Sequence, residues 1–157
     1  MIPIAQIVSH KGTAFDAKTW RVMSKVAWRA GAEDWHEETL PKHFTAKGTR
    51  EYRYKPRAKS YMKRKASQKK HQNPLVWSGE SKKLAEASYK LRASSKGARL
   101  VLSLPKHFYQ YRKDLKQPNK ARELQAITQQ DAEQMAGVLD GTMQDQINNS
   151  PDNEHRV

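Results

Sequence analysis

A histidine followed by two carboxylates, His36, Glu37 and Glu38, lies in a stretch with helical periodicity. A zinc-protease helix needs a second histidine four residues after the first, so that both imidazoles face one metal ion. A leucine occupies that position here, and the next histidine, His43, lies beyond a proline that is expected to end the helix. We therefore predict no metal site and interpret these residues as a solvated helix end.

Other catalytic arrangements find little support. The chain has no cysteine, which excludes disulfide scaffolds, thiolate metal sites and cysteine nucleophiles. Metal-dependent cleavage of nucleic acid needs clustered carboxylates, whereas residues 42–92 contain only three glutamates. No glycine pattern resembles a phosphate-binding loop, and Ser78 and Ser103 have no neighbouring base in the sequence. We predict no catalytic, metal-binding or cofactor-binding residues, and hence a protein that is not an enzyme.

Positive charge interleaved with tyrosine is the strongest chemical signal. The cations are Arg53, Lys55, Arg57, Lys59, Lys63, Arg64, Lys65, Lys69 and Lys70, and the tyrosines among them are Tyr52, Tyr54 and Tyr61. Such residues neutralise phosphates and stack on exposed bases, as a nucleic-acid surface requires. They also bind acidic surfaces of protein partners or sister subunits. A merely solubilising face is the third interpretation, and composition leaves all three open.

The distribution of charge sharpens this signal. The chain has 30 Lys plus Arg against 16 Asp plus Glu, a formal charge of +14. Residues 42–92 hold 16 of the cations and 3 carboxylates, a net +13, whereas residues 123–150 hold five carboxylates and no cation. One protein therefore offers a strongly positive middle and a negative C-terminal element, which can attract each other between copies.

The supply of apolar residues is small for 157 residues. Hydrophobic residues make up 36% of the chain, and the mean hydropathy is -0.99. Either parts of the chain extend as arms, or partner surfaces complete the fold. No apolar run approaches the ~20 residues that span a bilayer, and the first residues lack the pattern of a secretory signal. We expect a single domain over residues 1–147, with no contact to a membrane.

Two helices are predicted from periodicity. In residues 14–38 one arc holds Trp20, Trp28 and Trp35, which we expect in the core, and the opposite arc is basic. Thr13 and Asp16 have the spacing of a capping box, and the helix should end before Pro41. Thr128 and Asp131 repeat the cap spacing ahead of a second helix, and residues 148–157 are expected to form a disordered tail.

Between these helices the sequence predicts a small antiparallel sheet. Residues 89–93 and 98–104 flank a glycine-containing turn, which is a hairpin pattern, and residues 51–54 are a candidate for a further short strand. Residues 55–73 are densely basic with few large apolar side chains, and we predict an extended basic arm at about residues 50–73. The fold class is therefore α+β: a long N-terminal helix, a small sheet with a β-hairpin, a C-terminal helix and the arm.

The order of several local runs resembles a family of virion morphogenesis proteins of tailed bacteriophages, the small neck and tail-completion proteins. The runs are Leu40-Pro41-Lys42-His43-Phe44, Tyr52-Arg53-Tyr54-Lys55-Pro56-Arg57, Tyr61 with Arg64-Lys65, His71 before Pro74-Leu75-Val76-Trp77-Ser78-Gly79-Glu80, the hairpin, Pro105-Lys106-His107-Phe108-Tyr109-Gln110-Tyr111-Arg112, and Glu123-Leu124. The resemblance covers about residues 14 to 148. Departures occur at Lys70, where similar sequences have glycine, and at Ser81-Lys82-Lys83 after Gly79.

The resemblance implies a non-enzymatic structural protein of the head–tail junction, in the neck or in tail completion. It would assemble with copies of itself as a ring, expected to be a hexamer, and join the head connector to the tail terminator or tail tube, in virions assembled in the bacterial host cytoplasm. The predicted contact residues are Arg53, Tyr54, Arg57, Tyr61, Arg64, Lys65, Leu75, Val76 and Trp77. Genomic DNA is a further expected contact if the arm lines a channel. The alternative is a stand-alone basic nucleic-acid-binding protein.

Overall fold

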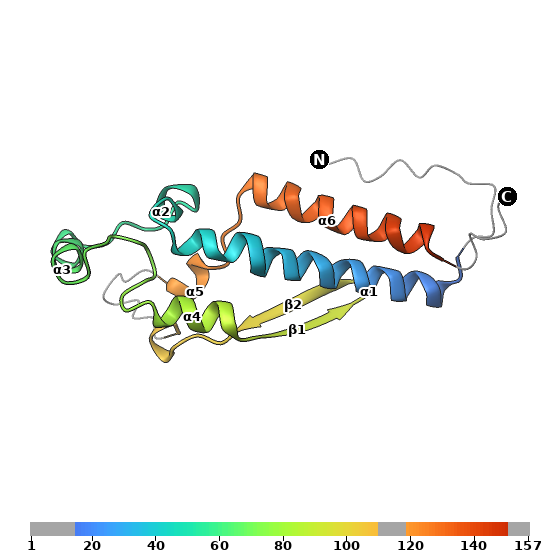
Figure 1. Cartoon of the computed structure of the whole chain (residues 1–157), viewed down its shortest axis with the longest axis horizontal. Helices are drawn as coiled ribbons and strands as arrows, with labels where there is room; N and C mark the ends of the chain where they lie inside the picture. Colours follow the sequence, from blue (N-terminus) through green and yellow to red (C-terminus); the bar gives the residue numbers. More distant parts are fainter. Residues whose placement is uncertain (1–14, 110–118, 151–157) are drawn as a thin grey trace.

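The longest element is α1, Ala17–Asp34, which runs through the middle of the molecule in the computed structural model (Figure 1). The structure describes residues 15–109 and 119–150. Asp16 caps α1 by accepting a hydrogen bond from the backbone N–H of Thr19 at 2.6 Å. Thr13, the other residue of the predicted capping box, lies outside the described residues. The predicted long N-terminal helix is confirmed.

The chain does not leave the helical path at the expected point. A π-helical turn, η1 (Trp35–Thr39), and a 3₁₀ turn, η2 (Leu40–Phe44), continue α1 beyond Pro41. Pro41 stands at the start of η2, and its fixed φ angle suits the first turn of a helical segment. The proline therefore changes the type of helix instead of ending it.

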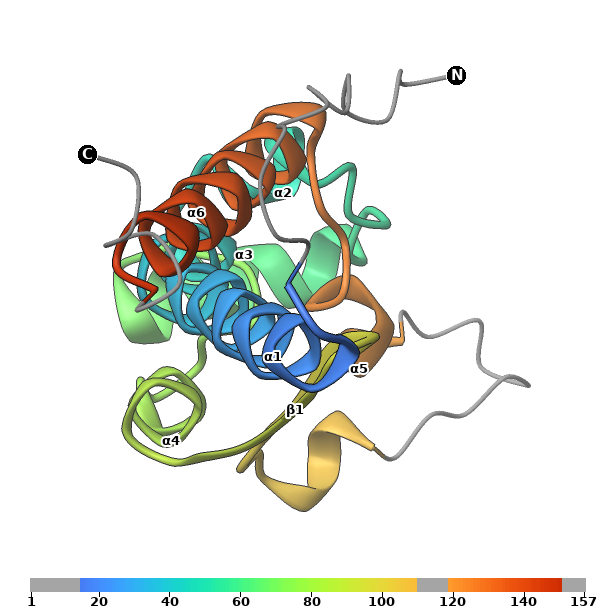
Figure 2. The ribbon, with the colours of Figure 1, turned by 90° about the vertical axis from the view of Figure 1, so that its right-hand side faces the viewer.

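Three layers make up the body of the molecule (Figures 1 and 2). The hairpin of β1 (Tyr89–Ser94) and β2 (Gly97–Leu102) packs on one side of α1, and α6 (Gln129–Asn148) packs on the other. The strands are antiparallel, with Tyr89 opposite Leu102 and Ser94 opposite Gly97, which confirms the predicted hairpin. The fold is α+β, as the sequence predicted.

The contact between α1 and α6 depends on a glycine. A Cβ atom at Gly31 would lie 3.1 Å from Cγ of Leu139 in α6, so the small residue permits the close approach of the two helices. At the start of α6, Thr128 and Asp131 form a capping box in which each side chain accepts a hydrogen bond from the other residue's backbone N–H. This confirms the cap predicted from the spacing.

Residues 48–69 differ from the prediction. They form α2 (Gly48–Glu51) and α3 (Lys59–Lys69), and no strand occurs at residues 51–54, so that candidate strand is wrong. The basic segment does project at one end of the molecule, but it does so as the helix α3 (Figure 1). The remaining short helices are α4 (Glu80–Ala87), η3 (Lys106–Phe108) and α5 (Lys120–Glu123).

The core lies at the C-terminal end of the α1 path, where several short elements meet. Its buried residues are Leu40, Phe44, Tyr52, Tyr54, Leu75, Val76, Ala85, Phe108 and Leu124. The prediction that three tryptophans of the first helix form the core is wrong for Trp20 and Trp28, which are 49% and 37% exposed. A two-stranded hairpin and one helix leave part of the circumference of α1 uncovered, and only Trp35 packs against the core.

The C-terminal helix extends slightly further than predicted. Helix α6 continues to Asn148, and Ser150 is buried, so the predicted tail began too early. Residues 151–157 of that predicted tail lie outside the described residues. Within the described part of the chain, no helix has the length and hydrophobicity needed to cross a membrane.

Candidate partner-binding surface

Helix α3 and the loop that precedes α4 form a surface rich in aromatic rings and cations. The rings of Tyr61 and Trp77 lie 5.6 Å apart, centroid to centroid. The guanidinium of Arg64 lies 5.4 Å from the centroid of the Trp77 ring, and Nζ of Lys69 lies 5.7 Å from it. We call Tyr61, Arg64, Lys69 and Trp77 the α3 surface. Three of these four residues were predicted as contacts, and Lys69 was only part of the basic run.

The loop from residue 74 to residue 79 holds Trp77 in place. Leu75 and Gly79 both have positive φ angles, 59° and 87°, which bend the backbone sharply. Leu75 and Val76 are buried in the core and anchor the loop, so the next side chain, Trp77, lies against α3. The predicted role of Leu75 and Val76 as the apolar part of an interface is therefore corrected, because both side chains are already covered by their own chain.

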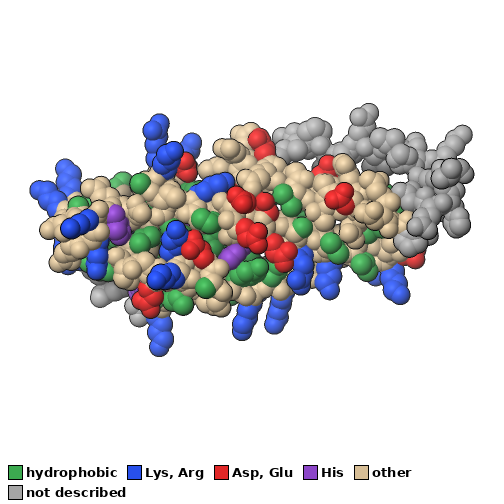
Figure 3. Space-filling model, viewed as in Figure 1, with side chains coloured by type: hydrophobic (Ala, Val, Ile, Leu, Met, Phe, Trp, Pro, Cys, Tyr) green, Lys and Arg blue, Asp and Glu red, His purple; other side chains and the backbone are tan. Residues whose placement is uncertain are grey.

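The cations of α3 have few opposite charges near them. The helix carries five lysine or arginine residues and no carboxylate. Among the described residues, the ion pairs join Arg29 to Glu33, Lys42 to Asp131, Arg57 to Glu123 and Lys82 to Glu86, and none involves a residue of α3. Lys and Arg side chains gather at the end of the molecule that α3 occupies (Figure 3). Cations held over an aromatic ring gain only about 0.5–1 kcal/mol at exposed sites, so they keep most of their capacity to bind an external group.

Other predicted contact residues have partners within the chain. Arg57 donates from Nη1 to Oε1 of Glu123 at 2.9 Å and also bonds the other carboxylate oxygen. Both side chains are largely buried, so this pair joins the segment before α3 to α5. Arg53 is exposed, with a positive φ of 50°. Its side chain is available for contacts but is not part of the α3 surface.

Two predicted contact residues turn out to be buried. Tyr54 is 6% exposed, and its hydroxyl is hydrogen-bonded to Nδ1 of His43. Lys65, although it belongs to α3, is 2% exposed and donates to the backbone oxygen of Asn73. Neither side chain can contribute anchoring area to a partner in this conformation, because burial within the subunit removes it from the surface.

A buried polar cluster beneath α2 was not predicted from the sequence. It consists of Lys42, His43, Tyr52, Tyr54 and Asp131. The rings of His43 and Tyr52 stack with centroids 3.7 Å apart, and His43 is fully buried. Burial lowers the pKa of His43 to about 4; Asp131 opposes the shift and Lys42 adds to it. Burial also raises the pKa of Tyr52 and of Tyr54, so all three rings are neutral at pH 7.

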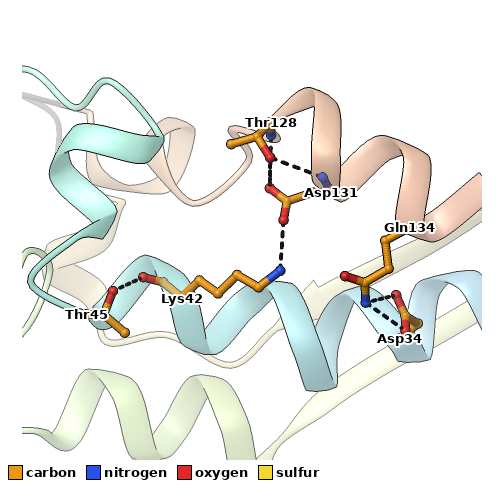
Figure 4. A network of polar contacts seen from close by, with 6 residues as sticks. All are labelled: Asp34, Lys42, Thr45, Thr128, Asp131 and Gln134. Atoms are coloured by element: carbon orange, nitrogen blue, oxygen red, sulfur yellow. Dashed lines mark hydrogen bonds and ion pairs between the residues drawn. The ribbon is translucent and has the colours of Figure 1, made fainter.

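Asp131 joins the start of α6 to Lys42 in η2 (Figure 4). Its carboxylate accepts hydrogen bonds from the backbone N–H and hydroxyl of Thr128 and from Nζ of Lys42, the last at 3.1 Å. Burial alone would raise the pKa of Asp131, but these bonds outweigh it and the pKa is lowered. The cap spacing identified Asp131 as a helix start, whereas no sequence signal linked it to Lys42, which is 89 residues away.

The prediction of a solvated helix end is confirmed for Glu37 and Glu38, which are exposed, and is wrong for His36. His36 is buried, its Nε2 lies 2.9 Å from the backbone oxygen of Ala85, and its ring packs on Tyr89 with centroids 4.0 Å apart. It therefore connects η1 to α4 and β1. In the ranges that the structure describes, no group of three histidine, aspartate or glutamate residues is arranged to hold a metal ion.

Comparisons with known proteins add no relative. The sequence matches no family model, and no curated protein or solved structure is significantly similar to it. The function of the α3 surface must therefore be argued from its own geometry and from the order of the sequence runs described above.

Proposed function

We propose that the chain is a non-enzymatic structural subunit of the head–tail junction of a tailed bacteriophage, acting in the neck or in tail completion. In this proposal it forms a ring with copies of itself and joins the head connector to tail components. The ordered sequence runs support the family. The observation that carries the proposal is the α3 surface, where Arg64 and Lys69 flank Trp77 without a carboxylate partner in the described residues.

The separation of charge supports contacts between copies. Helix α3 has four exposed cations and no carboxylate, and α6 has three exposed carboxylates and no lysine or arginine. The two helices occupy different ends of an elongated molecule (Figure 1). Contact between the α3 surface of one copy and α6 of the next would be head-to-tail, and head-to-tail contacts close into rings when the rotation between copies allows it. Opposite charges at such a contact also favour the correct orientation.

Exposed apolar side chains on the body are consistent with the same proposal. Trp20, Val22 and Trp28 of α1 are 49%, 56% and 37% exposed. Such side chains are costly in contact with water and would gain about 25 cal/mol for each Å² that a neighbouring subunit covers. A ring supplies such cover without a larger core in each subunit.

The proposal is tested in a phage that lacks this chain and is supplied with it from a plasmid. The double variant Arg64→Glu/Lys69→Glu should leave the subunit folded, because both side chains are exposed, and should block the joining of heads to tails. The matched control is Lys90→Glu/Arg92→Glu on β1, which changes the charge equally at two other exposed cations. Electron microscopy counts the complete particles. Normal numbers of complete particles with the Arg64→Glu/Lys69→Glu variant, or without the chain, would refute the proposal.

One observation favours a second candidate, a stand-alone nucleic-acid-binding protein. An aromatic ring flanked by two cations, as at Trp77, also stacks on a base while the cations bind phosphates. This candidate expects the purified monomer to bind free DNA or RNA, with a log–log salt slope of about 0.9 for each phosphate neutralised on duplex DNA. The assembly proposal instead predicts that the Arg64→Glu/Lys69→Glu variant fails to join heads to tails. This failure should occur even if the wild-type protein binds free nucleic acid only weakly.

A further inference from the structure

A small cavity lies on the inner side of α3, behind the α3 surface. Its volume is about 80 Å³, roughly the space of two or three water molecules. Three cationic residues, Lys55, Arg57 and Lys65, line it, and none of its lining residues is acidic. Thr49 and Gln72 add side chains that can donate hydrogen bonds. The cavity therefore combines positive charge with neutral donors.

Lys65 is the unusual member of this set. Its side chain is 2% exposed, and the hydrogen bond described for its ammonium goes to the backbone oxygen of Asn73. An ammonium has three N–H donors, so one acceptor leaves part of its hydrogen-bonding capacity for another group. Burying a charge without an opposite charge is unfavourable, and a chain that retains such a lysine usually pairs it.

The neighbouring charges do not supply that pairing. Burial lowers the pKa of Lys65, and the positive charges of Arg57 and Lys120 lower it further. Burial and Arg57 likewise lower the pKa of Lys120, which Glu123 only partly opposes. Among the described ion pairs, Glu123 is the carboxylate at this cluster, and its two oxygens already bond Arg57. Among the described residues, the carboxylate of Glu123 thus stands against four cations, Lys55, Arg57, Lys65 and Lys120, which leaves an excess of positive charge around the cavity.

We propose that this cavity binds a phosphate-sized oxyanion, with the ammonium of Lys65 as its charged contact. The anion would complete the hydrogen bonds of the Lys65 ammonium and offset the excess positive charge. The small volume of the cavity favours a compact anion. The group is either free inorganic phosphate or a phosphodiester of a nucleic acid. The inference does not rest on the head–tail proposal, because it concerns Lys65 on the inner side of α3, and Tyr61 is the one residue of the α3 surface that also lines the cavity.

The test is calorimetric titration of the full chain with inorganic phosphate at constant ionic strength, with sodium chloride as the blank. Lys65→Met keeps most of the side-chain length and removes the charge, and should weaken phosphate binding about 10- to 100-fold. The matched control is Lys63→Met, an exposed lysine of the same helix, whose affinity should stay within about twofold. Absence of phosphate binding by the wild type, or equal binding by Lys65→Met, would overturn the proposal.

Two further measurements keep the test decisive. In phosphate-free buffer Lys65→Met should be at least as stable as the wild type, since it removes a buried charge, whereas a merely structural lysine would make the variant less stable. NMR titration of the Lys65 ammonium in the wild type is the second measurement, and it does not need the variant. Phosphate should then raise the pKa of that ammonium, and an unchanged pKa contradicts the site.

The source of the anion is resolved by competition. An oligonucleotide without terminal phosphate that displaces inorganic phosphate supports the site and assigns it to the backbone of a nucleic acid. Phosphate binding that the oligonucleotide does not affect supports the site and assigns it to free phosphate. Displacement by chloride alone at equal ionic strength contradicts an oxyanion site.

Discussion

The buried polar cluster beneath α2 and the α3 surface use the same kinds of side chain in opposite ways. In the cluster, Lys42 meets Asp131 at 3.1 Å, and His43 bonds Tyr54. On the α3 surface, Arg64 and Lys69 lie over the ring of Trp77 and form no ion pair among the described residues. A charge with an opposite partner holds elements of one chain together, whereas a charge without one remains able to bind another molecule.

This comparison predicts that substitutions in the two regions affect different properties. Changes in the cluster should lower the free energy of unfolding, because they remove buried partners. Changes on the α3 surface should alter binding with little change in stability. Unfolding measurements on variants of both regions test that division.

Asp131→Ala should be the most destabilising of these changes. It removes the carboxylate half of the capping box of α6 and leaves Lys42 without its carboxylate, and Asp131 itself is only 2% exposed. Losing a capping interaction costs about 0.5–2 kcal/mol, and the ion pair adds about 1 kcal/mol or less because the Lys42 side chain is 37% exposed, so we expect a loss of about 2 kcal/mol in urea unfolding. Glu133→Ala, an exposed carboxylate in the same helix, is the control and should be nearly neutral. Equal effects of the two changes would show that the cluster does not hold α6.

The stability of the protein should also fall as the pH is lowered from 6.5 to about 4. The pKa of His43 is 6.5 when unfolded and about 4 when folded, so the unfolded chain binds more protons in this range. The loss should approach about 3 kcal/mol, since each pKa unit corresponds to about 1.4 kcal/mol. Asp131 contributes in a different window, because its lowered pKa preserves its stabilising effect until the pH falls below 3.8.

His43→Phe provides the comparison for this pH dependence. The variant should be less stable at pH 7, because Tyr54 loses its hydrogen-bond partner. Its free energy of unfolding should nevertheless change less between pH 6.5 and 4 than that of the wild type. An equal slope in both proteins would mean that other groups cause the pH dependence.

Gly48→Ala tests the junction between the two regions and should have an intermediate effect. A Cβ atom at this position would lie 2.8 Å from the backbone oxygen of Lys42, and backbone atoms cannot move aside as a flexible side chain can. Overpacking of this kind costs about 1–3 kcal/mol. Gly137→Ala in α6 is the control, because its Cβ would meet no atom within 4 Å, and it should be neutral or stabilising. Thermal unfolding of both variants measures the difference.

The smallest effect on stability is expected on the α3 surface. Lys69→Ala should change the free energy of unfolding by no more than about 0.5 kcal/mol, because the side chain is exposed and its contact with Trp77 is weak at such a site. A loss of stability comparable to that of Asp131→Ala would show that the α3 surface contributes to folding, as the buried polar cluster does, and would contradict the difference between the two regions.

The main elements of the body follow from local patterns in the sequence. Periodicity predicts the N-terminal helix, the cap spacing of Thr128 and Asp131 predicts α6, and alternation around a glycine-containing turn predicts the hairpin. These signals act within a few residues, so they can be interpreted without knowledge of the tertiary structure.

The core and the basic helix could not be predicted in the same way. Helix α3 has no apolar stripe, and its contacts with its own chain are made by the buried Lys65 and by the loop that follows the helix. Tyr54 and Leu75 lie in stretches that look exposed, and they are buried only because the end of α1 and the loop before α4 meet there. Long-range contacts of this kind leave no periodic signal along the chain.

The central claim is that the α3 surface serves binding and not folding, and Trp77→Ala tests it most directly. Its free energy of unfolding and its incorporation into phage particles should be measured together, with Tyr109→Ala as the control for loss of an exposed aromatic ring elsewhere. We predict that Trp77→Ala loses about 1 kcal/mol or less of stability, because its ring is only partly buried, yet is absent from particles, whereas Tyr109→Ala is incorporated. Incorporation of Trp77→Ala at the wild-type level, or its unfolding, would contradict the claim.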